Sequence, residues 1–477
     1  MPRYNYDRLS VQDNSFLLVE SANSHMHVSS TLIYEAGPLR TVDGGIDINR
    51  IMRATESYLH RIPRYRQKLH MVPFFDHAVW VDDRHFKLDY HVRHTALPDP
   101  GTDEQLQALS SRVMAQPLDR ARPLWETWIV EGLEGDRFAV ITKIHHCMID
   151  GMAGQDLAQI LHSTEPGERT PEAPKPFVPR PRPSDRELLK DEVGRYLSIP
   201  GRATRGIREA TREINELRSE FTTRAKSMLT MVQGMRDVPT KTPLNEPIGP
   251  HRRFDWRDMP LEDVKVVRKA IGCTINDLVL AIVTGAVREF LIGRGHSVHG
   301  LDFRIAAPVS IRSSEDGAMG NRVSQWFVRA PVEEDDPLER VEKIREVTEE
   351  LKASNQALDA DLIMSVAEWT PTNLLTLASR SASGAPPYNM MVTNVPGPQF
   401  PLYLLGARLV SLYSQVPIAD ATALGVALVS YDGKLCWGFN ADYGLVPDLD
   451  AFADLIEASF REVAQAAGVT FEPGEPG

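Results

Sequence analysis

Two adjacent histidines and a nearby aspartate, His145, His146 and Asp150, are the side chains of this sequence best suited to acid–base chemistry. The ordinary pKa of histidine lies closest to neutrality, which suits proton transfer at cellular pH. They belong to residues 145–151, where Gly151 gives a turn its backbone freedom and Asp150 can cap the turn or hold it by a salt bridge. A purely structural turn is the alternative, but His-His-x-x-x-Asp-Gly arises by chance only about once in a thousand chains of this length. The pattern therefore favours a functional site.

The flanking residues predict a strand followed by a helix. The apolar run 138–144 is typical of a buried strand, and apolar residues recur at helical spacing over residues 152–161. Because adjacent residues on a strand face opposite ways, His145 and His146 should have different roles, one facing reactants while the other packs or hydrogen-bonds. Cys147 as an acyl-accepting nucleophile is an alternative that the same alternation disfavours, since it turns the thiol away from His146.

The composition is that of an ordinary globular protein with an acidic balance. Of 477 residues, 42% are hydrophobic and 25% are charged, and the length suits two or three domains. The net charge of -12 and the isoelectric point near 5.7 give no support for nucleic acid as a main partner.

Cysteine and histidine spacing gives no indication of a metal site or a disulfide framework. The three cysteines, Cys147, Cys273 and Cys436, are odd in number and lack paired spacing, which favours a reducing compartment. The remaining histidines show no spacing typical of metal ligands, among them His25, His27, His60, His91 and His94. No bound metal is expected.

The sequence predicts a cytoplasmic protein that is soluble or peripherally bound to a membrane. Residues 1–8 lack the apolar core of a signal peptide, and no uninterrupted apolar stretch is long enough to span a bilayer. A mixed-charge helical stretch is expected from about Arg186 to Val232, rich in arginine between Arg202 and Arg224. This stretch is either a solvated helical surface or a contact with the inner membrane or a lipid droplet, because basic amphipathic helices bind anionic interfaces.

The chain divides into two folded halves, residues 1–164 and 249–477, and a connector over residues 165–248. Prolines and charges accumulate from Glu165 to Asp185, a composition that predicts an extended linker. In both halves, patterns typical of strands alternate with patterns typical of helices, which predicts an α/β fold.

Individual elements are expected as follows. Helices are predicted at 48–61, 261–270, 275–292, 337–353 and 448–466, with a further helical stretch through Leu374. Strands are predicted at 29–34, 303–309 and 323–328, and around Met390 and Leu409. Thr274 is expected to cap the helix from Ile275, and Asp432-Gly433 is a pair favoured in two-residue hairpin turns.

Further motifs accompany the histidine pattern along the chain. They are Asp13-Asn14-Ser15-Phe16, Met26-His27-Val28, Arg122-Pro123-Leu124-Trp125-Glu126, the run 274–281 with Asn276-Asp277, the run 308–312, Gly320-Asn321-Arg322 and the run 393–398. His-His-x-x-x-Asp-Gly is the signature of the acyltransferase superfamily that includes chloramphenicol acetyltransferase and peptide-synthetase condensation domains. Taken together, the motifs resemble one branch of it, the bacterial wax ester synthase/acyl-CoA:diacylglycerol acyltransferases. Cys147 and Met148 fill variable positions, and Thr393 stands where that family usually has serine.

The resemblance implies two chloramphenicol-acetyltransferase-like lobes with mixed sheets, joined by the proline-rich and helical connector, with a substrate channel between them. The histidine motif would lie at the junction, with acyl-CoA entering from one side and an acceptor alcohol from the other. The implied activity moves a long-chain acyl group from acyl-CoA to the hydroxyl of diacylglycerol, of a long-chain alcohol, or of both. Diacylglycerol is the favoured acceptor, although a broad apolar channel discriminates weakly between the two. Because a thioester is already activated, no metal or cofactor is implied, and acyl-CoA is a substrate.

The resemblance also implies roles for residues of the site. The second histidine, His146, is the expected general base, while His145 and Asp150 support the loop. Asn276 is a candidate donor to the charge that develops on the carbonyl oxygen. Three arginines are candidates for the basic partner of the aspartate: Arg66, Arg304 and Arg312.

Five more residues are expected to line or border the channel: Gly151, Pro123, Leu124, Trp125 and Asp277. For the Pro-Leu-Trp segment, a packed corner is the alternative to a substrate contact, because Leu and Trp are typical core residues. For Asp277, the alternative is a structural neighbour of Asn276.

A second class of function remains open, namely a non-catalytic or carrier-protein-dependent relative of condensation domains that binds lipids or acylated carriers. Intact His146, Asp150 and Asn276 favour catalysis. The lack of an attached carrier domain favours free acyl-CoA over a tethered thioester. Release of free CoA from palmitoyl-CoA in the presence of an alcohol would distinguish the two classes.

Overall fold

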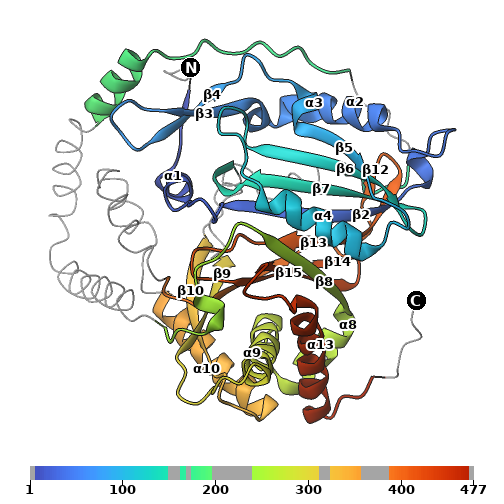
Figure 1. Cartoon of the computed structure of the whole chain (residues 1–477), viewed down its shortest axis with the longest axis vertical. Coiled ribbons are helices and arrows are strands. Elements are labelled where there is room, and N and C mark those ends of the chain that lie inside the picture. Colours follow the sequence, from blue (N-terminus) through green and yellow to red (C-terminus); the bar gives the residue numbers. More distant parts are fainter. Residues whose placement is uncertain are drawn as a thin grey trace, which may run out of the picture.

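The computed structural model describes residues 6–148, 162–167, 173–195, 239–310, 323–355 and 386–471. They form two lobes, each built around a six-stranded sheet, and the lobes lie one above the other in Figure 1. Each lobe has its own cluster of buried hydrophobic side chains. The two-lobe α/β fold with mixed sheets is therefore as expected from the sequence.

The sheet of the first lobe has the strand order β12-β13-β2-β7-β6-β5. Its strands are β2 (His27–Glu35), β5 (Val92–Ala96), β6 (Trp125–Leu133), β7 (Arg137–His145), β12 (Tyr403–Leu404) and β13 (Ala407–Gln415). β5 and β6 pair in parallel, and the other neighbours pair antiparallel. β7 lies inside the sheet and buries Phe138 and Ile141 completely. The histidine motif therefore leaves the sheet from an interior strand that is held on both edges.

β12 and β13 come from the second half of the chain, so the expected division at residue 249 is wrong for residues 403–415. β13 pairs with β2 of the first lobe, and Tyr413 stacks on Trp256 with ring centroids 4.7 Å apart. Alternate residues of β13 are buried, as in a half-buried strand, but this alternation does not specify which sheet the strand joins. The first lobe consists of the N-terminal half plus this segment.

The sheet of the second lobe has the strand order β10-β9-β11-β14-β15-β8. Its strands are β8 (Arg252–Pro260), β9 (Phe303–Ser310), β10 (Val323–Ala330), β11 (Met390–Pro396), β14 (Leu424–Tyr431) and β15 (Lys434–Asp442). β11 runs parallel to both β9 and β14, and the remaining neighbours are antiparallel. β14 and β15 form a hairpin whose turn residues, Asp432 and Gly433, have φ of 43° and 83°. This is the two-residue turn predicted from their sequence.

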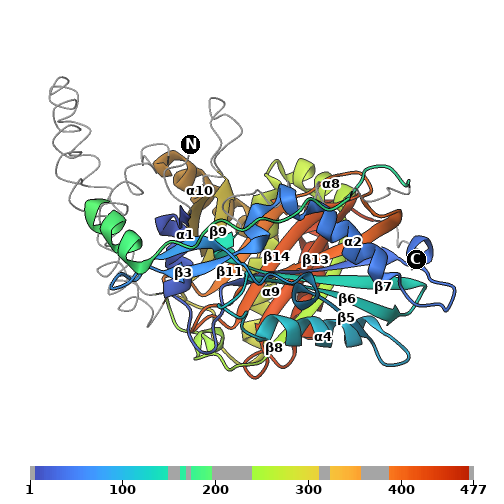
Figure 2. The ribbon, with the colours of Figure 1, turned by 90° about the horizontal axis from the view of Figure 1, so that it is seen from above.

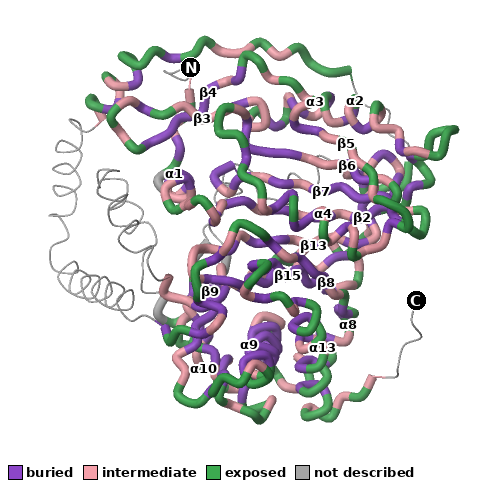
Figure 3. Tube along the Cα trace, in the orientation of Figure 1, coloured by how far each residue is buried: buried purple, intermediate pink, exposed green. Residues whose placement is uncertain are grey.

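The helices of the second lobe are α8 (Leu261–Ile271), α9 (Ile275–Gly293), α10 (Pro337–Asn355) and α13 (Leu449–Ala466). In Figure 1, α9, α10 and α13 lie on the side of the sheet away from the first lobe. α9 is almost wholly buried between its neighbours (Figure 3). The predicted bounds of all four helices are confirmed to within two residues.

The helices of the first lobe are α1 (Val11–Leu18), α2 (Ile48–Tyr58), α3 (Leu88–His91) and α4 (Asp103–Ala115). Short 3-10 turns complete the described helical structure: η1 (Gly37–Leu39), η2 (Leu59–Arg61), η3 (Pro63–Arg66), η4 (His146–Met148) and η6 (Pro243–Asn245). α4 packs against β2 and β7 of its own lobe and against β8 of the other lobe. It therefore lies at the junction of the lobes.

A buried lysine fixes the end of α4. Nζ of Lys143, on β7, donates hydrogen bonds to the carbonyls of Val113 at 2.8 Å and Gln116 at 2.9 Å. The last carbonyls of a helix lack partners within the helix, so a buried ammonium group is well placed there. Burial lowers the pKa of Lys143 to about 8, and Glu126, 3.7 Å away, opposes that shift. α4 is thus tied to the strand that ends in His145.

A third, small sheet has the order β1-β4-β3, with β1 (Asp7–Arg8), β3 (Gln67–Met71) and β4 (Ala78–Asp82). Residues 173–184 form neither helix nor strand and pass over this part of the first lobe before a helical segment at 185–195 (Figures 1 and 2). Arg180 binds Asp82 through its backbone N–H at 2.8 Å and its guanidinium at 3.1 Å. The extended form agrees with the predicted linker. Two parts of the predicted connector, residues 168–172 and 196–238, lie outside the described residues.

The described ranges contain no single helix that is both long enough and apolar enough to cross a membrane. α8 and α9 pass that test only together, and the chain bends by 97° between them.

Candidate active site

The histidine motif begins at the end of β7 and continues into η4 (His146–Met148). The backbone N–H of His145 donates to the carbonyl of Leu124 at 3.0 Å, and that of His146 donates to the carbonyl of Met26 at 2.8 Å. Leu124 precedes β6 and Met26 precedes β2, the two strands that flank β7. The turn is therefore held from both sides of the sheet.

The imidazole of His145 is buried and contacted at both ring nitrogens. The backbone N–H of Cys147 donates to Nδ1 at 3.2 Å, which places the proton of the neutral ring on Nε2. Nε2 lies 3.2 Å from Oε1 of Glu20, off the line of an ideal hydrogen bond. His145 thus has the packing role expected for one of the two histidines.

Glu20 is the carboxylate that holds this ring. Its Oε1 accepts a hydrogen bond from the backbone N–H of Met26 at 2.7 Å, and its Oε2 binds Arg120. Burial raises the pKa of Glu20, but the contact with His145 and the two other hydrogen bonds outweigh burial and lower the pKa to about 2. Glu20 is therefore ionised at any physiological pH.

His146 occupies a different environment from His145. Its ring is half-buried and packs on the ring of Phe16 from α1, with centroids 4.0 Å apart. Burial, together with His145, lowers the pKa of His146 to about 4. The imidazole is therefore neutral at pH 7 and able to accept a proton. The two rings thus lie in different surroundings, as predicted, while which of them faces the reactants stays a prediction.

Cys147 is 2% exposed, and burial raises the pKa of its thiol. Nucleophilic cysteines react as thiolates, so a buried thiol with a raised pKa is a poor nucleophile. The surroundings of Cys147 disfavour an acyl-enzyme mechanism because of burial and not because of strand alternation, since Cys147 lies in η4.

A cavity of about 280 Å³ adjoins His145, and its walls include Glu20, His25, His27 and Leu124. The His27 ring meets that of His145 edge to face, with centroids 5.7 Å apart. Burial lowers the pKa of His27 well below that of an ordinary imidazole, and burial also lowers the pKa of His25. The cavity is thus lined by two imidazoles that are neutral near pH 7, beside one ionised carboxylate.

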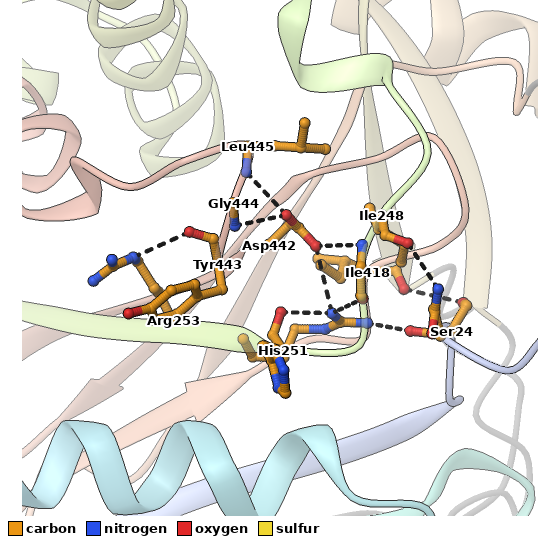
Figure 4. Close-up of polar contacts among 12 residues, drawn as sticks. Ser24, Ile248, His251, Arg253, Ile418, Asp442, Tyr443, Gly444 and Leu445 are labelled. Carbon is orange, nitrogen blue, oxygen red and sulfur yellow. Dashed lines mark hydrogen bonds and ion pairs between the residues drawn. The ribbon is translucent and has the colours of Figure 1, made fainter.

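The loop of residues 21–25, between α1 and β2, is tied to the second lobe. Nδ2 of Asn23 donates to the carbonyl of Ile248 at 3.0 Å, and Oγ of Ser24 donates to the carbonyl of Ile418 at 3.1 Å (Figure 4). This loop directly follows Glu20 and leads to the strand that holds the histidine turn. The motif therefore lies beside the junction of the lobes, as expected.

The Pro-Leu-Trp segment forms a packed corner. Pro123, Leu124 and Trp125 are all buried. The indole N–H of Trp125 donates to the carbonyl of Tyr65 at 2.9 Å, and the indole stacks on His91 with centroids 4.6 Å apart. Leu124 also lines the cavity beside His145. These contacts favour the packing interpretation for Pro123 and Trp125 and leave Leu124 as the member that can meet a ligand.

Asn276 and Asp277 lie in the first turn of α9, in the second lobe, and differ in their surroundings. Oδ2 of Asp277 accepts hydrogen bonds from the backbone and hydroxyl of Thr274 at 3.0 and 2.6 Å, and Oδ1 accepts one from Thr348 at 2.8 Å. Thr274 is the N-cap of α9, as predicted, and Asp277 is the buried residue that completes its capping box and ties α9 to α10. These contacts support the structural alternative. Asn276 is half-buried and remains the candidate oxyanion donor.

Several expected site residues, Asp150, Gly151 and Arg312, lie outside the described residues, so their roles stay predictions. Of the other candidate partners for Asp150, Arg304 donates to the carboxylate two residues before it, at 3.1 Å. The guanidinium of Arg66 lies 4.3 Å from the centre of an aromatic ring of the connector.

The sequence analysis did not single out Glu20 or Lys143, and it named His27 in a motif without assigning it to the site. Lys143 could have been found, because a charged residue inside the apolar run 138–144 must be paired if that strand is buried. Glu20 follows the apolar run 16–19 and carries no comparable signal.

Among the described residues, no group of three or more His, Cys, Asp or Glu side chains is arranged to hold a metal ion.

Comparison with known proteins gives concordant matches over nearly the whole chain. The wax ester synthase/diacylglycerol acyltransferase catalytic domain matches residues 9–279, and the C-terminal domain of the same family matches residues 319–464. A putative diacylglycerol O-acyltransferase of Mycobacterium tuberculosis is 32% identical over 470 residues, covering 97% of this chain and 91% of the relative. A probable diacylglycerol O-acyltransferase of the same organism is 31% identical over 464 residues, with 94% of each chain covered.

Solved structures show the same fold. The wax ester synthase/diacylglycerol acyltransferase from Marinobacter aquaeolei has a TM-score of 0.67 at 24% identity, covering 97% of this chain and 100% of that one. The starter condensation domain of rhizomide synthetase, in complex with an acyl-CoA, has a TM-score of 0.56 at 13% identity and covers 97% of this chain and 95% of its own.

Proposed function

The chain belongs to the wax ester synthase/diacylglycerol acyltransferase family, and on that premise we propose that His146 is the general base of an acyl transfer from acyl-CoA to a lipid hydroxyl. Family membership makes the protein an acyltransferase. The observation that carries the assignment of the base is the half-buried imidazole of His146, whose pKa is lowered to about 4 beside a fixed His145.

The proposed step needs one base and no covalent intermediate. His146 takes the proton of the acceptor hydroxyl while its oxygen forms a bond to the thioester carbonyl carbon. The carbon–sulfur bond then breaks, its electron pair leaves with sulfur, and the proton held by His146 passes to the CoA thiolate. The products are an ester and free CoA, so the reaction balances without a metal or a cofactor.

Two further residues complete the proposal. Asn276 donates a hydrogen bond to the developing oxyanion, aided by its place in the first turn of α9, where the helix dipole is positive. Asp150 holds the far side of the turn through a basic partner. His145 and Glu20 act on the reaction only by positioning the turn.

The acceptor is proposed to be diacylglycerol, with long-chain alcohols also used. The mycobacterial relatives described as diacylglycerol O-acyltransferases support this order. The test is to supply palmitoyl-CoA with diacylglycerol and hexadecanol in competition and to analyse the lipid products. Triacylglycerol in excess over wax ester is expected, and the absence of any ester product would overturn the proposal.

Because condensation domains share this fold, an acyl donor attached to a carrier protein remains the alternative to free acyl-CoA. That alternative predicts transfer from an acylated carrier protein but no release of CoA from free palmitoyl-CoA. Thiol release that requires both palmitoyl-CoA and an alcohol separates the two.

We also propose that the protein works in the cytoplasm, bound peripherally to the inner membrane or to lipid droplets, because its lipid substrates and products reside there. The arginine-rich stretch from Arg202 to Arg224 is the proposed contact on grounds of charge. Co-sedimentation with anionic vesicles should be salt-sensitive and should weaken when Arg205, Arg208 and Arg212 are replaced by glutamate. Unchanged co-sedimentation would place the contact elsewhere.

A further inference from the structure

A second and larger cavity, of about 780 Å³, lies at the junction of the lobes between α4 and the start of β8. α4 contributes Gln107, Ser111 and Arg112, and the other lobe contributes residues 250–254 and Tyr443. Its volume falls within the range of cavities that hold a substrate or cofactor.

The wall from the second lobe presents a cation stacked on an aromatic ring. The guanidinium carbon of Arg253 lies 4.0 Å from the centre of the Tyr443 ring, and Nε donates to the carbonyl of Tyr443 at 3.3 Å (Figure 4). The ring of His251 approaches Tyr443 edge to face, with centroids 6.3 Å apart. Tyr443 is 51% exposed, so the stack presents a surface on which a planar base can lie.

Hydrogen bonds fix the backbone that carries this stack. Oδ1 of Asp442 accepts from the backbone N–H groups of Gly444 and Leu445, both at 2.9 Å, which sets the turn around Tyr443 (Figure 4). Oδ2 of Asp442 accepts from the backbone N–H of Gly249 at 2.7 Å. Nη1 of Arg252 donates to the carbonyls of the residues on either side of Pro250, Gly249 at 2.7 Å and His251 at 2.8 Å. The wall is thus organised before a ligand binds, which lowers the cost of binding.

The rim of this cavity, formed by Arg112, Arg253 and Tyr443, is positively charged, whereas the whole chain carries a net negative charge. Arg112 and Arg253 form no ion pair with any residue in the described ranges, and Glu104 is the acidic residue among the described lining. The chain as a whole carries a net charge of -12. Two guanidinium groups that have no carboxylate partner within the described part of the chain and line one cavity favour an anion, and guanidinium groups are well suited to phosphate.

The cavity adjoins the histidine motif. Pro117 lines both this cavity and the smaller one that contains Glu20 and His145. A ligand held at the rim can therefore extend a flexible arm past Pro117 toward the motif.

We propose that this cavity binds the phosphorylated adenosine end of acyl-CoA, with the base on the Arg253–Tyr443 stack and the phosphates on Arg112 and Arg253. The inference rests on the proposed function, because acyl-CoA is the substrate that joins a nucleotide to a long flexible arm and a thioester. The lipid acceptor has neither a base nor the phosphates, so the rim selects the acyl donor.

The test measures binding of CoA itself by titration calorimetry to the wild-type protein, to Arg112→Glu/Arg253→Glu and to Tyr443→Leu. The matched control is Arg84→Glu/Arg461→Glu, which makes the same change in net charge at two exposed arginines that line neither cavity. Kd for CoA should rise about tenfold or more in the double rim variant, because each lost charged contact to phosphate is worth about tenfold. 3′-Dephospho-CoA should bind more weakly than CoA to the wild type, and this difference should shrink in the rim variant. Thermal melting curves check that each variant is folded.

Kinetics give a second, independent measurement. KM for palmitoyl-CoA should rise with Kd, while KM for the acceptor and kcat at saturation stay unchanged. Equal effects of the rim and control substitutions, a rise in KM for the acceptor alone, or no CoA binding by the wild type would overturn the inference. Rim-dependent CoA binding without any transfer product would refute the proposed function and leave this site standing.

Discussion

Each lobe places a carboxylate beside a motif of the candidate site, half-buried in the first lobe and buried in the second, and the two carboxylates have different partners. Glu20 in the first lobe lies 3.2 Å from Nε2 of His145, a ring of the histidine motif. Among the described residues, Asp277 in the second lobe accepts hydrogen bonds from hydroxyl and backbone groups, those of Thr274 and Thr348. The carboxylate within the Asn-Asp motif completes a helix capping box, and the carboxylate outside any motif contacts His145 at the histidine turn. The presence of a carboxylate in a motif therefore does not determine its role; the groups that it contacts do.

The largest effect on turnover is expected at His146, whose neighbour His145 contacts Glu20. His146→Ala should lower kcat about 10²- to 10⁴-fold, because it removes the general base. The melting temperature should change little, since the ring is only half-buried. A folded His146→Ala protein with undiminished turnover would show that His146 is not the general base.

Asn276→Ala tests whether the residue before Asp277, in the first turn of α9, takes part in the reaction. Loss of one oxyanion donor should lower kcat about 10²-fold with little change in KM for either substrate. Steady-state kinetics together with a melting curve provide the measurement. If stability fell instead of kcat, Asn276 would share the structural role of Asp277 and the oxyanion donor would have to lie elsewhere.

Glu20→Gln should reduce both kcat and stability. The loss in kcat should be roughly tenfold, because the turn is displaced while the base is retained. The pKa of Glu20 is lowered to about 2 in the fold, so its ionised form stabilises the protein fully above about pH 4.5, and this contribution is lost as pH falls toward 2. Denaturant unfolding should therefore show a deficit of about 3 kcal/mol at pH 7 that shrinks at pH 3. A deficit that does not vary with pH would mean that the charge of Glu20 is irrelevant.

The smallest effect on turnover is expected for Asp277→Ala. Removing a helix cap should cost about 1–2 kcal/mol of unfolding free energy and leave kcat per folded molecule nearly unchanged. Asp277→Asn is the matched control, because it keeps one acceptor oxygen and should lose less stability. A selective fall in kcat without loss of stability would indicate that Asp277 lines the substrate channel instead.

Local patterns predicted the parts of the fold that local physics determines. The bounds of α9 and α10 follow from apolar periodicity, and the Asp432-Gly433 turn follows from the positive φ that such a pair tolerates. The partner of β13 could not be predicted in this way, because alternation of buried residues is the same whichever sheet a strand joins.

Site residues that are close together in the sequence could be predicted, and those that meet only through strand pairing could not. His145 and His146 follow from their place at the end of an apolar strand. The two rings differ in their surroundings because β7 ends at His145 and His146 begins the 3-10 turn η4. Glu20 reaches His145 only because β2 pairs with β7, a contact between segments more than a hundred residues apart. No spacing in the sequence encodes that approach.

The central claim is that His146 acts as a neutral base, and the pH dependence of acceptor-dependent CoA release by the wild-type protein tests it most directly. Because the pKa of His146 is lowered to about 4, the rate should stay on a plateau from neutral pH down to about pH 5 and fall as pH passes through 4. Rates should be read only over the pH range in which the protein remains folded. A fall centred near pH 6.5, the ordinary pKa of histidine, or CoA release that needs no alcohol, would contradict the account.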